Sequence, residues 1–236
     1  MRLEVDISSK AFTNAAGERH DVLRNIAFTL EQGEVGVLVG PSGCGKTTML
    51  RILTGLDHDY QGRVSRPAAL RIGMVFQEPR LLPWRSVEEN VRLAAPKADE
   101  ARLSALFDVL ELSGHRAHFP GELSLGLARR VALARALAVD PDFLILDEPL
   151  ASLDAALAAR LRSQIATLLE GRATMTLLVT HNLDDAVRLG DRLFLLSARP
   201  ARVLHEVPIA KPRSARSAAD IREAKDALAQ LYAADG

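Results

Sequence analysis

The sequence predicts an α/β fold with a mostly parallel sheet, and two observations support this. Short runs of apolar residues recur along the chain, and patterns typical of helices lie between them. Near-continuous apolarity is typical of strands that are buried on both faces of a parallel sheet. Strands that alternate with helices indicate the α/β class. The expected strands are residues 35–39, 72–76, 143–146, 175–179 and 193–196.

Composition narrows the class of protein. A length of 236 residues suits one large domain or a domain with a subdomain. The formal net charge of zero disfavours a nucleic-acid binder, and the aromatic content of 4% disfavours a base-stacking surface. The single cysteine cannot form an internal disulfide, which fits a reducing compartment.

No segment has the pattern of a membrane span or a secretory signal. The first six residues include two acids and lead to no apolar core. A spanning helix needs about 20 apolar residues, and runs such as 143–146 are far shorter. Any role at a membrane is therefore expected to come through a partner.

Helical patterns differ between regions of the chain. Positions 153, 157, 161, 165 and 168 form one apolar stripe at helical spacing. Residues 182–190 form a short helical pattern with acids in its first turn and glycine at its end. Residues 86–138 are rich in Ala, Leu and Arg and show no strand pattern, so we expect a helical insertion there.

The C-terminal region is expected to contain a linker followed by a docked helix. Residues 207–216 have the composition of a linker, and residues 217–220 then match a capping box. One apolar face follows, made of Ile221, Ala224, Leu228 and Leu231.

Residues 40–47 match the phosphate-binding pattern G-x-x-x-x-G-K-[ST] in full. An apolar strand precedes them and a helical pattern follows, which is the context of a P-loop. Lys46 can then reach the β- and γ-phosphates, and the Thr47 hydroxyl can bind Mg²⁺. The alternative, a glycine-rich turn with an incidental lysine, fits this context poorly. The expected nucleotide contacts are Gly40, Pro41, Ser42, Gly43, Cys44, Gly45, Lys46, Thr47 and Thr48, with no chemistry assigned to the Cys44 side chain.

Two carboxylates follow the strand expected at 143–146. A buried strand would place Asp147 and Glu148 at the carboxyl edge of the sheet, where ligands bind in such folds. Asp147 is then expected to support Mg²⁺, and Glu148 to polarise the attacking water as a general base. The alternative is an exposed Asp-Glu turn before Pro149.

Together with further motifs, these residues resemble the ATP-binding-cassette (ABC) transporter ATPases over residues ~1 to 207. Gln77 resembles that family's Q-loop, residues 123–127 its LSGGQ signature, residues 151–154 its D-loop and His181 its switch histidine. The resemblance implies a P-loop NTPase core with an N-terminal antiparallel β part and a helical subdomain at about 86–138. Residues 208–236 would then be the linker and C-terminal helix.

The resemblance also implies roles for single residues. Gln77 and His181 join Glu148 as catalytic residues, with Gln77 within reach of Mg²⁺ and His181 bonded to the γ-phosphate. Ser124 and Gly126 would contact the ATP held by the opposite subunit, Asp154 would meet that subunit, and Phe12 would stack on adenine. Each has an ordinary alternative: a polar strand end for Gln77 and His181, a helix cap for Asp154, and a core position for Phe12.

The signature departs from the family pattern at two positions. Leu125 stands in place of its first glycine and Leu127 in place of its glutamine. Ser124 and Gly126, which in that family donate hydrogen bonds to the ATP of the opposite subunit, remain. The departure affects the expected rate more than the role, and it leaves open a heterodimer whose other subunit has a better signature.

Residues 77–91 resemble the ATPase subunits of bacterial importers for nitrate, sulfonates, taurine and related small oxyanions. The leading hypothesis is an ATPase that uses ATP and Mg²⁺, peripheral on the cytoplasmic face of the bacterial inner membrane. Its partners would be integral membrane permease subunits, a solute-binding protein indirectly, and a second ATPase subunit in a homodimer or heterodimer; no nucleic acid is expected. The alternatives are an ABC exporter ATPase, a nucleotide-gated binding module and a nucleic-acid-associated ABC ATPase.

An apolar run follows Gln77 directly. It consists of residues 81–84, and the prolines at positions 79 and 83 favour a loop over a helix. An apolar loop must be buried in its own domain or covered by a partner. The resemblance favours a groove that receives a short helix of the membrane subunit, and burial of Trp84 at home is the alternative.

Overall fold

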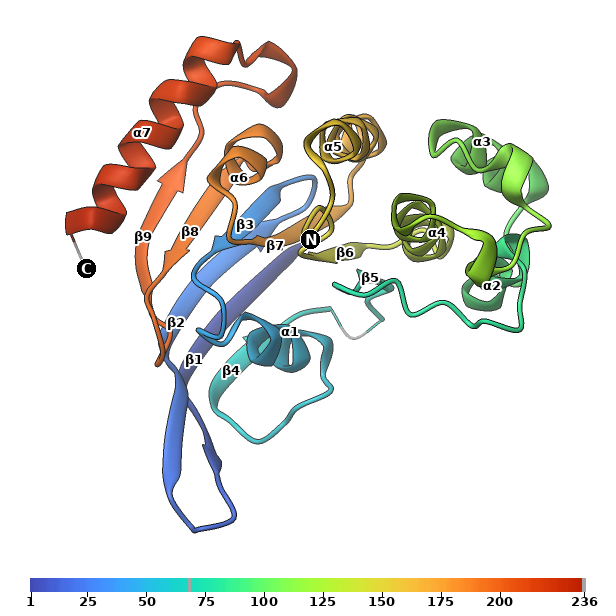
Figure 1. Ribbon diagram of the computed structural model, residues 1–236. Coiled ribbons are helices and arrows are strands. Elements are labelled where there is room, and N and C mark those ends of the chain that lie inside the picture. The colour runs from blue at the N-terminus through green and yellow to red at the C-terminus, as the bar shows by residue number, and fades with distance from the viewer. Residues whose placement is uncertain (68, 235–236) are drawn as a thin grey trace. The chain divides into compact units, whose positions relative to one another are not determined.

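The computed structural model describes residues 1–67 and 69–234, and Figure 1 shows its helices and strands. The chain divides into two units. The first unit comprises Met1–Ala69 and Leu177–Gly236, and the second comprises Leu70–Thr176.

The first unit begins with an antiparallel sheet. Strand β1 (Arg2–Thr13) pairs with β2 (Arg19–Glu31) on one side and with β4 (Gln61–Ser65) on the other. Along β1 the burial alternates, since Leu3, Val5 and Ile7 are buried while their polar neighbours are exposed. This alternation is typical of a strand with one face on a core. The sheet is the N-terminal antiparallel part that the resemblance implied.

The remaining strands of the first unit lead toward the phosphate-binding loop. Strand β3 (Val35–Val39), all of it buried, pairs in parallel with β8 (Arg192–Leu196). Strand β9 (Val203–Pro208) pairs antiparallel to β8, and β7 (Met175–Thr180) contributes its last four residues to this unit. These buried parallel strands confirm the expectations for residues 35–39 and 193–196.

Three α-helices lie among the described residues of the first unit. Helix α1 (Lys46–Thr54) follows the phosphate-binding loop, and α6 (Leu183–Leu189) follows β7. The Asn182 side chain caps α6 by accepting from the amides of Asp184 and Asp185, at 2.8 and 3.4 Å. Helix α7 (Ala218–Ala234) ends the described chain and lies beside α6 (Figure 1).

The expected linker is wrong in its first two residues. Val207 and Pro208 are the end of β9, where they face Leu193 and Arg192 of β8. Proline is tolerated at such a position because it can stand at a sheet edge where no ladder amide is needed. The connection therefore begins after residue 208 and includes the short 3-10 turn Arg213–Ala215.

The second unit has its own parallel pair of strands. Strand β5 (Ile72–Val75) pairs with β6 (Phe143–Asp147) in the register Ile72↔Phe143. Arg71 and Asp142 close the start of this pair with two side-chain hydrogen bonds, of 3.1 and 2.9 Å. Strand β5 ends one residue earlier than expected from the sequence, and all of β6 is buried.

The region 86–138 is helical, and none of its described residues lies in a strand. It contains α2 (Val87–Ala94), α3 (Glu100–Val109), α4 (Leu125–Ala138) and two 3-10 turns, Ser113–His115 and Pro120–Glu122. Helix α5 (Ala155–Leu169) follows β6 and buries the expected stripe at Leu161, Ile165 and Leu168.

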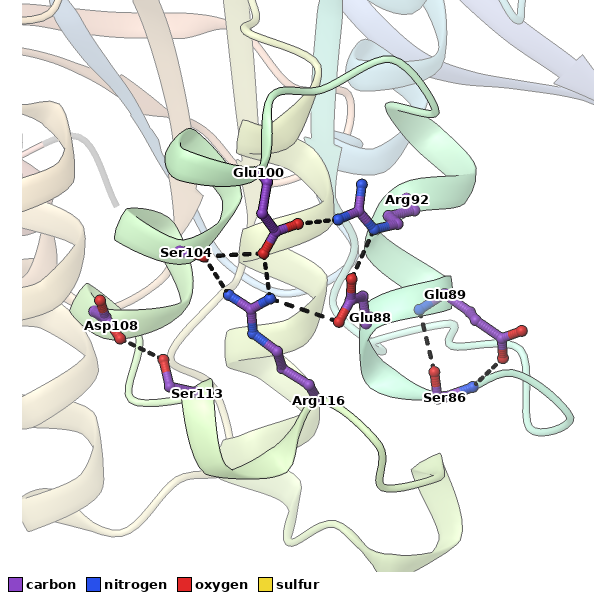
Figure 2. Close-up of polar contacts among 9 residues, drawn as sticks. All are labelled: Ser86, Glu88, Glu89, Arg92, Glu100, Ser104, Asp108, Ser113 and Arg116. Carbon is purple, nitrogen blue, oxygen red and sulfur yellow. Dashed lines mark hydrogen bonds and ion pairs between the residues drawn. The ribbon is translucent and has the colours of Figure 1, made fainter.

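An ionic network ties α2 and α3 to the turn that follows them (Figure 2). Arg116 donates to Glu100 at 2.6 Å and to the Ser104 hydroxyl at 2.7 Å, and Arg92 pairs with both Glu88 and Glu100. The hydrogen bond from Arg116 lowers the pKa of Glu100. Because these groups are all partly exposed to solvent, the network contributes little to stability.

Candidate nucleotide-binding and catalytic site

The loop between β3 and α1 has the backbone that phosphate binding requires. Gly43 and Gly45 have φ angles of 78° and 128°, values that L side chains rarely adopt. A Cβ at Gly45 would also lie 2.9 Å from Leu23 Cδ2 and 3.0 Å from Val22 Cγ1. At Gly43 a Cβ would meet nothing within 4 Å, so this part of the loop faces open space. The loop is therefore shaped by glycine at one position and open to a ligand at another.

Lys46 is folded back over its own loop. Its side chain is 6% exposed, and Nζ donates to the carbonyl oxygens of Gly40, at 2.8 Å, and Pro41, at 3.0 Å. Helix α1 begins at this lysine and has no acidic residue in its first turn. The positive end of the helix dipole and the ammonium group therefore lie at one point, which suits an anion.

His181 lies near the start of the phosphate-binding loop. The Gly40 amide donates to the carbonyl of Thr180, the last residue of β7, at 3.4 Å. His181 follows and is exposed. Gly40, Pro41 and His181 line a single cavity of about 390 Å³, so the structure brings the expected switch histidine and this loop together.

Phe12 is not a core residue. Its side chain is 45% exposed near the end of β1, and Lys10 Nζ lies 4.7 Å from its ring centroid. Position 12 faces His20 on β2. The core alternative is therefore wrong, since the ring is partly exposed to solvent.

In the second unit, β6 places both expected carboxylates at its end. Asp147, the last residue of the strand, is only 7% exposed, so the exposed-turn alternative is wrong for it. Glu148 follows, half-buried, with a φ of 46°. A left-handed backbone is uncommon for a residue other than glycine, and such residues cluster at functional sites.

Arg129 holds the backbone at Glu148, and sequence reasoning missed it. This residue of α4 is 6% exposed, and its Nη1 donates to the carbonyls of Glu148, at 3.1 Å, and Pro149, at 2.7 Å. Burial lowers the pKa of Arg129, and the negative charge of Glu148 opposes that shift. The helix behind the signature thus fixes the peptide that carries the expected general base.

The signature residues begin α4. Ser124 is its N-cap and accepts a hydrogen bond from the amide of Leu127 at 3.3 Å. The helix starts at Leu125, and the Leu125 side chain is 46% exposed. A Cβ at Gly126 would lie 2.5 Å from Leu157 Cδ2 of α5, so any larger residue there would have to displace the Leu157 side chain. Leucine is accommodated at position 125 because its side chain extends into solvent.

Asp154 and Gln77 occupy ordinary local positions. Asp154 is the N-cap of α5, and its Oδ1 accepts from the amide of Leu157 at 2.9 Å, as its alternative role predicted. Gln77 is exposed in a bend just after β5. Both side chains remain accessible to a ligand or partner.

Two polar side chains, which sequence reasoning missed, fix the loop after Gln77. Asn90, fully buried in α2, accepts from the Leu82 amide at 2.8 Å and donates to the Leu82 carbonyl at 3.2 Å. Arg135 of α4 donates to the carbonyls of Arg80 and Pro79, both at 2.8 Å. Trp84 projects from this held loop and is 69% exposed, so its burial at home is wrong.

Comparison with known proteins shows the family to which these motifs belong. Residues 23–151 match the ABC transporter family. The chain is 39% identical to the aliphatic sulfonates import ATP-binding protein SsuB 2 of Pseudomonas syringae over 235 residues, 98% of this chain and 99% of that protein. It is 38% identical to SsuB of Bacillus subtilis over 226 residues, 91% of this chain and 88% of that one.

A solved structure is similar as well. The dimeric post-hydrolysis state of the ATP-binding cassette MJ0796, bound to ADP and Pi, has a TM-score of 0.76 and 27% identity, and the match covers 90% of this chain and 100% of that one. The α/β fold with a P-loop core is thereby confirmed. None of the helices among the described residues is long and apolar enough to cross a bilayer.

Proposed function

Because this chain belongs to the ABC transporter family, we propose that it is the ATP-hydrolysing subunit of an importer for a small oxyanion. The observation that carries this proposal is the match of nearly the whole chain to proteins named for aliphatic sulfonate import. An alkyl sulfonate is therefore the first solute to test, followed by nitrate and taurine.

ATP is bound through the phosphate-binding loop in this proposal. The β- and γ-phosphates take the place of the Gly40 and Pro41 carbonyls as partners of Lys46, whose Nζ already lies at the loop. The amides of residues 42–48 supply further donors, together with the start of α1. Phe12 stacks on the adenine with its exposed face.

Mg²⁺ fits the oxygen donors that the chain offers. Thr47, Gln77 and Asp147 supply a hydroxyl, an amide oxygen and a carboxylate, which are the ligand types that Mg²⁺ prefers. The described residues contain no group of three or more His, Cys, Asp or Glu side chains placed to hold a metal ion. Mg²⁺ does not require one, since it usually takes one or two protein carboxylates with substrate phosphates and water. When bound, it would offset the negative charge of the phosphates.

Glu148 is the general base for hydrolysis. Its carboxylate accepts a proton from the attacking water, while His181 donates to the γ-phosphate and holds the reactants in line. Arg129 fixes the Glu148 peptide through two hydrogen bonds and so limits the positions that the carboxylate can take. Gln77 reports the nucleotide state to the loop that follows it.

The working form is a head-to-tail dimer. Ser124 and the Gly126 amide of one subunit contact the ATP in the other, and Asp154 meets the partner chain. The exposed start of α4 provides a positive helix end for that phosphate. ATP closes the dimer and hydrolysis reopens it, which converts phosphoryl transfer into motion.

The held loop at 77–85 passes this motion to membrane permease subunits. Trp84 supplies an exposed apolar group, and Asn90 and Arg135 keep its loop in one shape. We place the chain peripherally on the cytoplasmic face of the bacterial inner membrane. A solute-binding protein on the opposite side of this membrane delivers solute to the permeases.

Replacing Glu148 by Gln tests the proposal. The amide keeps the size of the side chain but cannot accept the proton, so we expect hydrolysis to fall by about 10²–10⁴-fold while ATP still binds. The measurement is phosphate release from Mg-ATP, beside binding of a fluorescent ATP analogue. Near-normal turnover by Glu148→Gln would show that another group is the base.

A further inference from the structure

The C-terminal helix reaches the nucleotide-binding loop, and one side chain makes the contact. The Tyr232 hydroxyl donates to the carbonyl oxygen of Val39 at 2.6 Å. Val39 is the last residue of β3 and immediately precedes Gly40, the first residue of the phosphate-binding loop. A residue 193 positions away in sequence therefore holds the point where the strand becomes the loop.

The connection that leads into α7 is anchored by a second residue, Arg216. The Arg216 side chain is 2% exposed, and its Nη1 donates to the carbonyls of Val187, at 2.6 Å, and Gly190, at 2.7 Å. These carbonyls lie at the C-terminal end of α6, where a helix leaves carbonyls without internal partners and where positive charge is favoured. Arg216 thus fastens the connection that leads into α7 to the end of α6.

Helix α7 also contacts the first turn of α6. Lys225 pairs with Asp184 at 3.2 Å, and Ile221 and Leu228 bury the apolar face of α7. Helix α6 begins two residues after His181, through the Asn182 cap. The C-terminal segment therefore contacts both ends of the helix that follows the switch histidine and ends at the loop that binds phosphate.

Tyr232, Gly40, Pro41 and His181 line the same cavity of about 390 Å³. Tyr232 and His181 therefore lie in the wall of one cavity beside the phosphate-binding loop, and the tyrosine hydroxyl bonds to the residue that precedes this loop. Burial raises the pKa of Tyr232 to about 12, so the hydroxyl keeps its proton at neutral pH and can donate.

We infer that Tyr232 is a positioning residue for nucleotide binding, which makes the C-terminal helix part of the ATP site. The hydrogen bond to Val39 restrains the first peptide of the loop before ATP arrives. Binding to a restrained loop loses less conformational entropy than binding to a free one. This inference deepens the proposed function, since it depends on ATP binding at residues 40–48.

Removal of the hydroxyl alone tests this role. In Tyr232→Phe the ring and its packing remain, and one hydrogen bond to Val39 is lost. A hydrogen bond of ordinary strength corresponds to about 3- to 10-fold in affinity, so we expect ATP to bind about 3- to 10-fold more weakly. KM for ATP should rise by a similar factor, while kcat at saturating ATP should stay within about twofold, because Glu148 and its supports are untouched.

Hydrogen exchange distinguishes positioning from a general loss of stability. In the nucleotide-free full chain, Tyr232→Phe should speed amide exchange in residues 40–48 and leave exchange in β6 unchanged. The other tyrosine provides a matched control: Tyr60→Phe should change neither the ATP affinity nor the exchange of residues 40–48. Binding is measured with a fluorescent ATP analogue on each purified chain.

Two results would overturn the inference. One is wild-type affinity for ATP in Tyr232→Phe; the other is an equal loss of affinity in Tyr60→Phe. Lys46→Ala is measured in parallel to separate this failure from a failure of the proposed function. If Lys46→Ala also binds like the wild type, the nucleotide site itself is elsewhere. If it loses binding while Tyr232→Phe does not, the loop binds ATP without help from α7.

Discussion

Arg129 donates a hydrogen bond to the backbone carbonyl of Glu148, so a buried cation on α4 holds the peptide of the proposed general base. The same helix carries Arg135, whose guanidinium holds the carbonyls of Pro79 and Arg80 instead. Two arginines on α4 therefore fasten two different segments of the second unit, the proposed catalytic one and the one proposed to face the permeases.

The roles of Arg129 and Arg135 can be distinguished by mutation. Arg129→Met should lower kcat about tenfold or more, since hydrogen bonds from charged groups contribute about 1.5–3 kcal/mol each. ATP affinity should change less than twofold, because the phosphate-binding loop lies in the other unit. Phosphate release is measured on the isolated chain beside thermal unfolding.

Arg135→Met is the matched control for that experiment. It removes an arginine from the same helix but should leave kcat of the isolated chain unchanged. Equal losses of kcat in both variants would indicate a general effect on α4. If Arg129→Met does not fold, Arg129→Lys keeps the charge with fewer donors and serves in its place.

The shared-site arrangement predicts complementation between two inactive chains. Lys46→Ala removes phosphate binding within its own chain. Ser124→Asp keeps a good N-cap for α4 but places a carboxylate toward the γ-phosphate of the partner's ATP. Mixing the two should restore about one working site per dimer.

Substitution of Ser124 is preferable to substitution of Gly126. Any side chain at Gly126 meets Leu157, so its effect on packing would be mixed with its effect on the dimer. Absence of activity in the mixture, with both variants folded and dimeric, would mean that the subunits do not share their sites head to tail.

Trp84 provides the test of whether the loop at 77–85 contacts the permease subunits. Since it is 69% exposed, Trp84→Ser should leave thermal stability and ATP binding of the isolated chain unchanged. Co-purification with the permease subunits should fall, because the partner loses its apolar contact. Leu82 is less suitable, since it is half-buried in a loop that Asn90 holds.

Leu56→Ser is the control for Trp84→Ser. Leu56 is 66% exposed and belongs to the first unit, so it offers a similar loss of exposed apolar surface elsewhere. Retention of the permeases by Trp84→Ser, or an equal loss with Leu56→Ser, would contradict a specific role for the loop.

The cap of α7 predicts a dependence of stability on acid pH. The hydrogen bond from Lys211, and then those from Ser217, hold the pKa of Asp220 down at about 2. A depressed pKa in the folded state favours folding above the unfolded pKa of about 4. That contribution is therefore lost as the pH falls from about 4 toward 2.

Asp220→Asn isolates the contribution of the Asp220 charge to stability. The wild type should unfold at a higher temperature than Asp220→Asn above about pH 5, and the difference should shrink below pH 4. A difference that stays constant from pH 6 to pH 3 would show that the charge of Asp220 does not stabilise the cap.

Several parts of the fold follow directly from the sequence. The buried strands β3, β6 and β7 are runs of apolar residues, and such runs have few alternatives to a two-sided core. The loop at 40–47 and the carboxylates at 147 and 148 take their places from the strands that precede them. The alternation of residues 2–7 also predicts a one-sided strand, although the apolar-run criterion did not include it.

Other parts depend on contacts between distant residues. The adjacent Arg129 and Arg130 are both buried in α4, which composition alone would not indicate because charged side chains are mostly exposed. Their burial depends on backbone carbonyls supplied by other segments. The shape of the loop that carries Trp84 likewise depends on hydrogen bonds from Asn90 and Arg135, neither of which belongs to a recognisable motif.

The left-handed backbone at Glu148 has a consequence for attempts to make this protein more heat-resistant. A φ of 46° is disfavoured for glutamate and readily adopted by glycine or asparagine. A library selected only for survival on heating should therefore enrich Gly or Asn at position 148, although neither can take the proton from water. Thermal selection at this position would then yield inactive enzyme, so such a library must be screened for turnover at the same time.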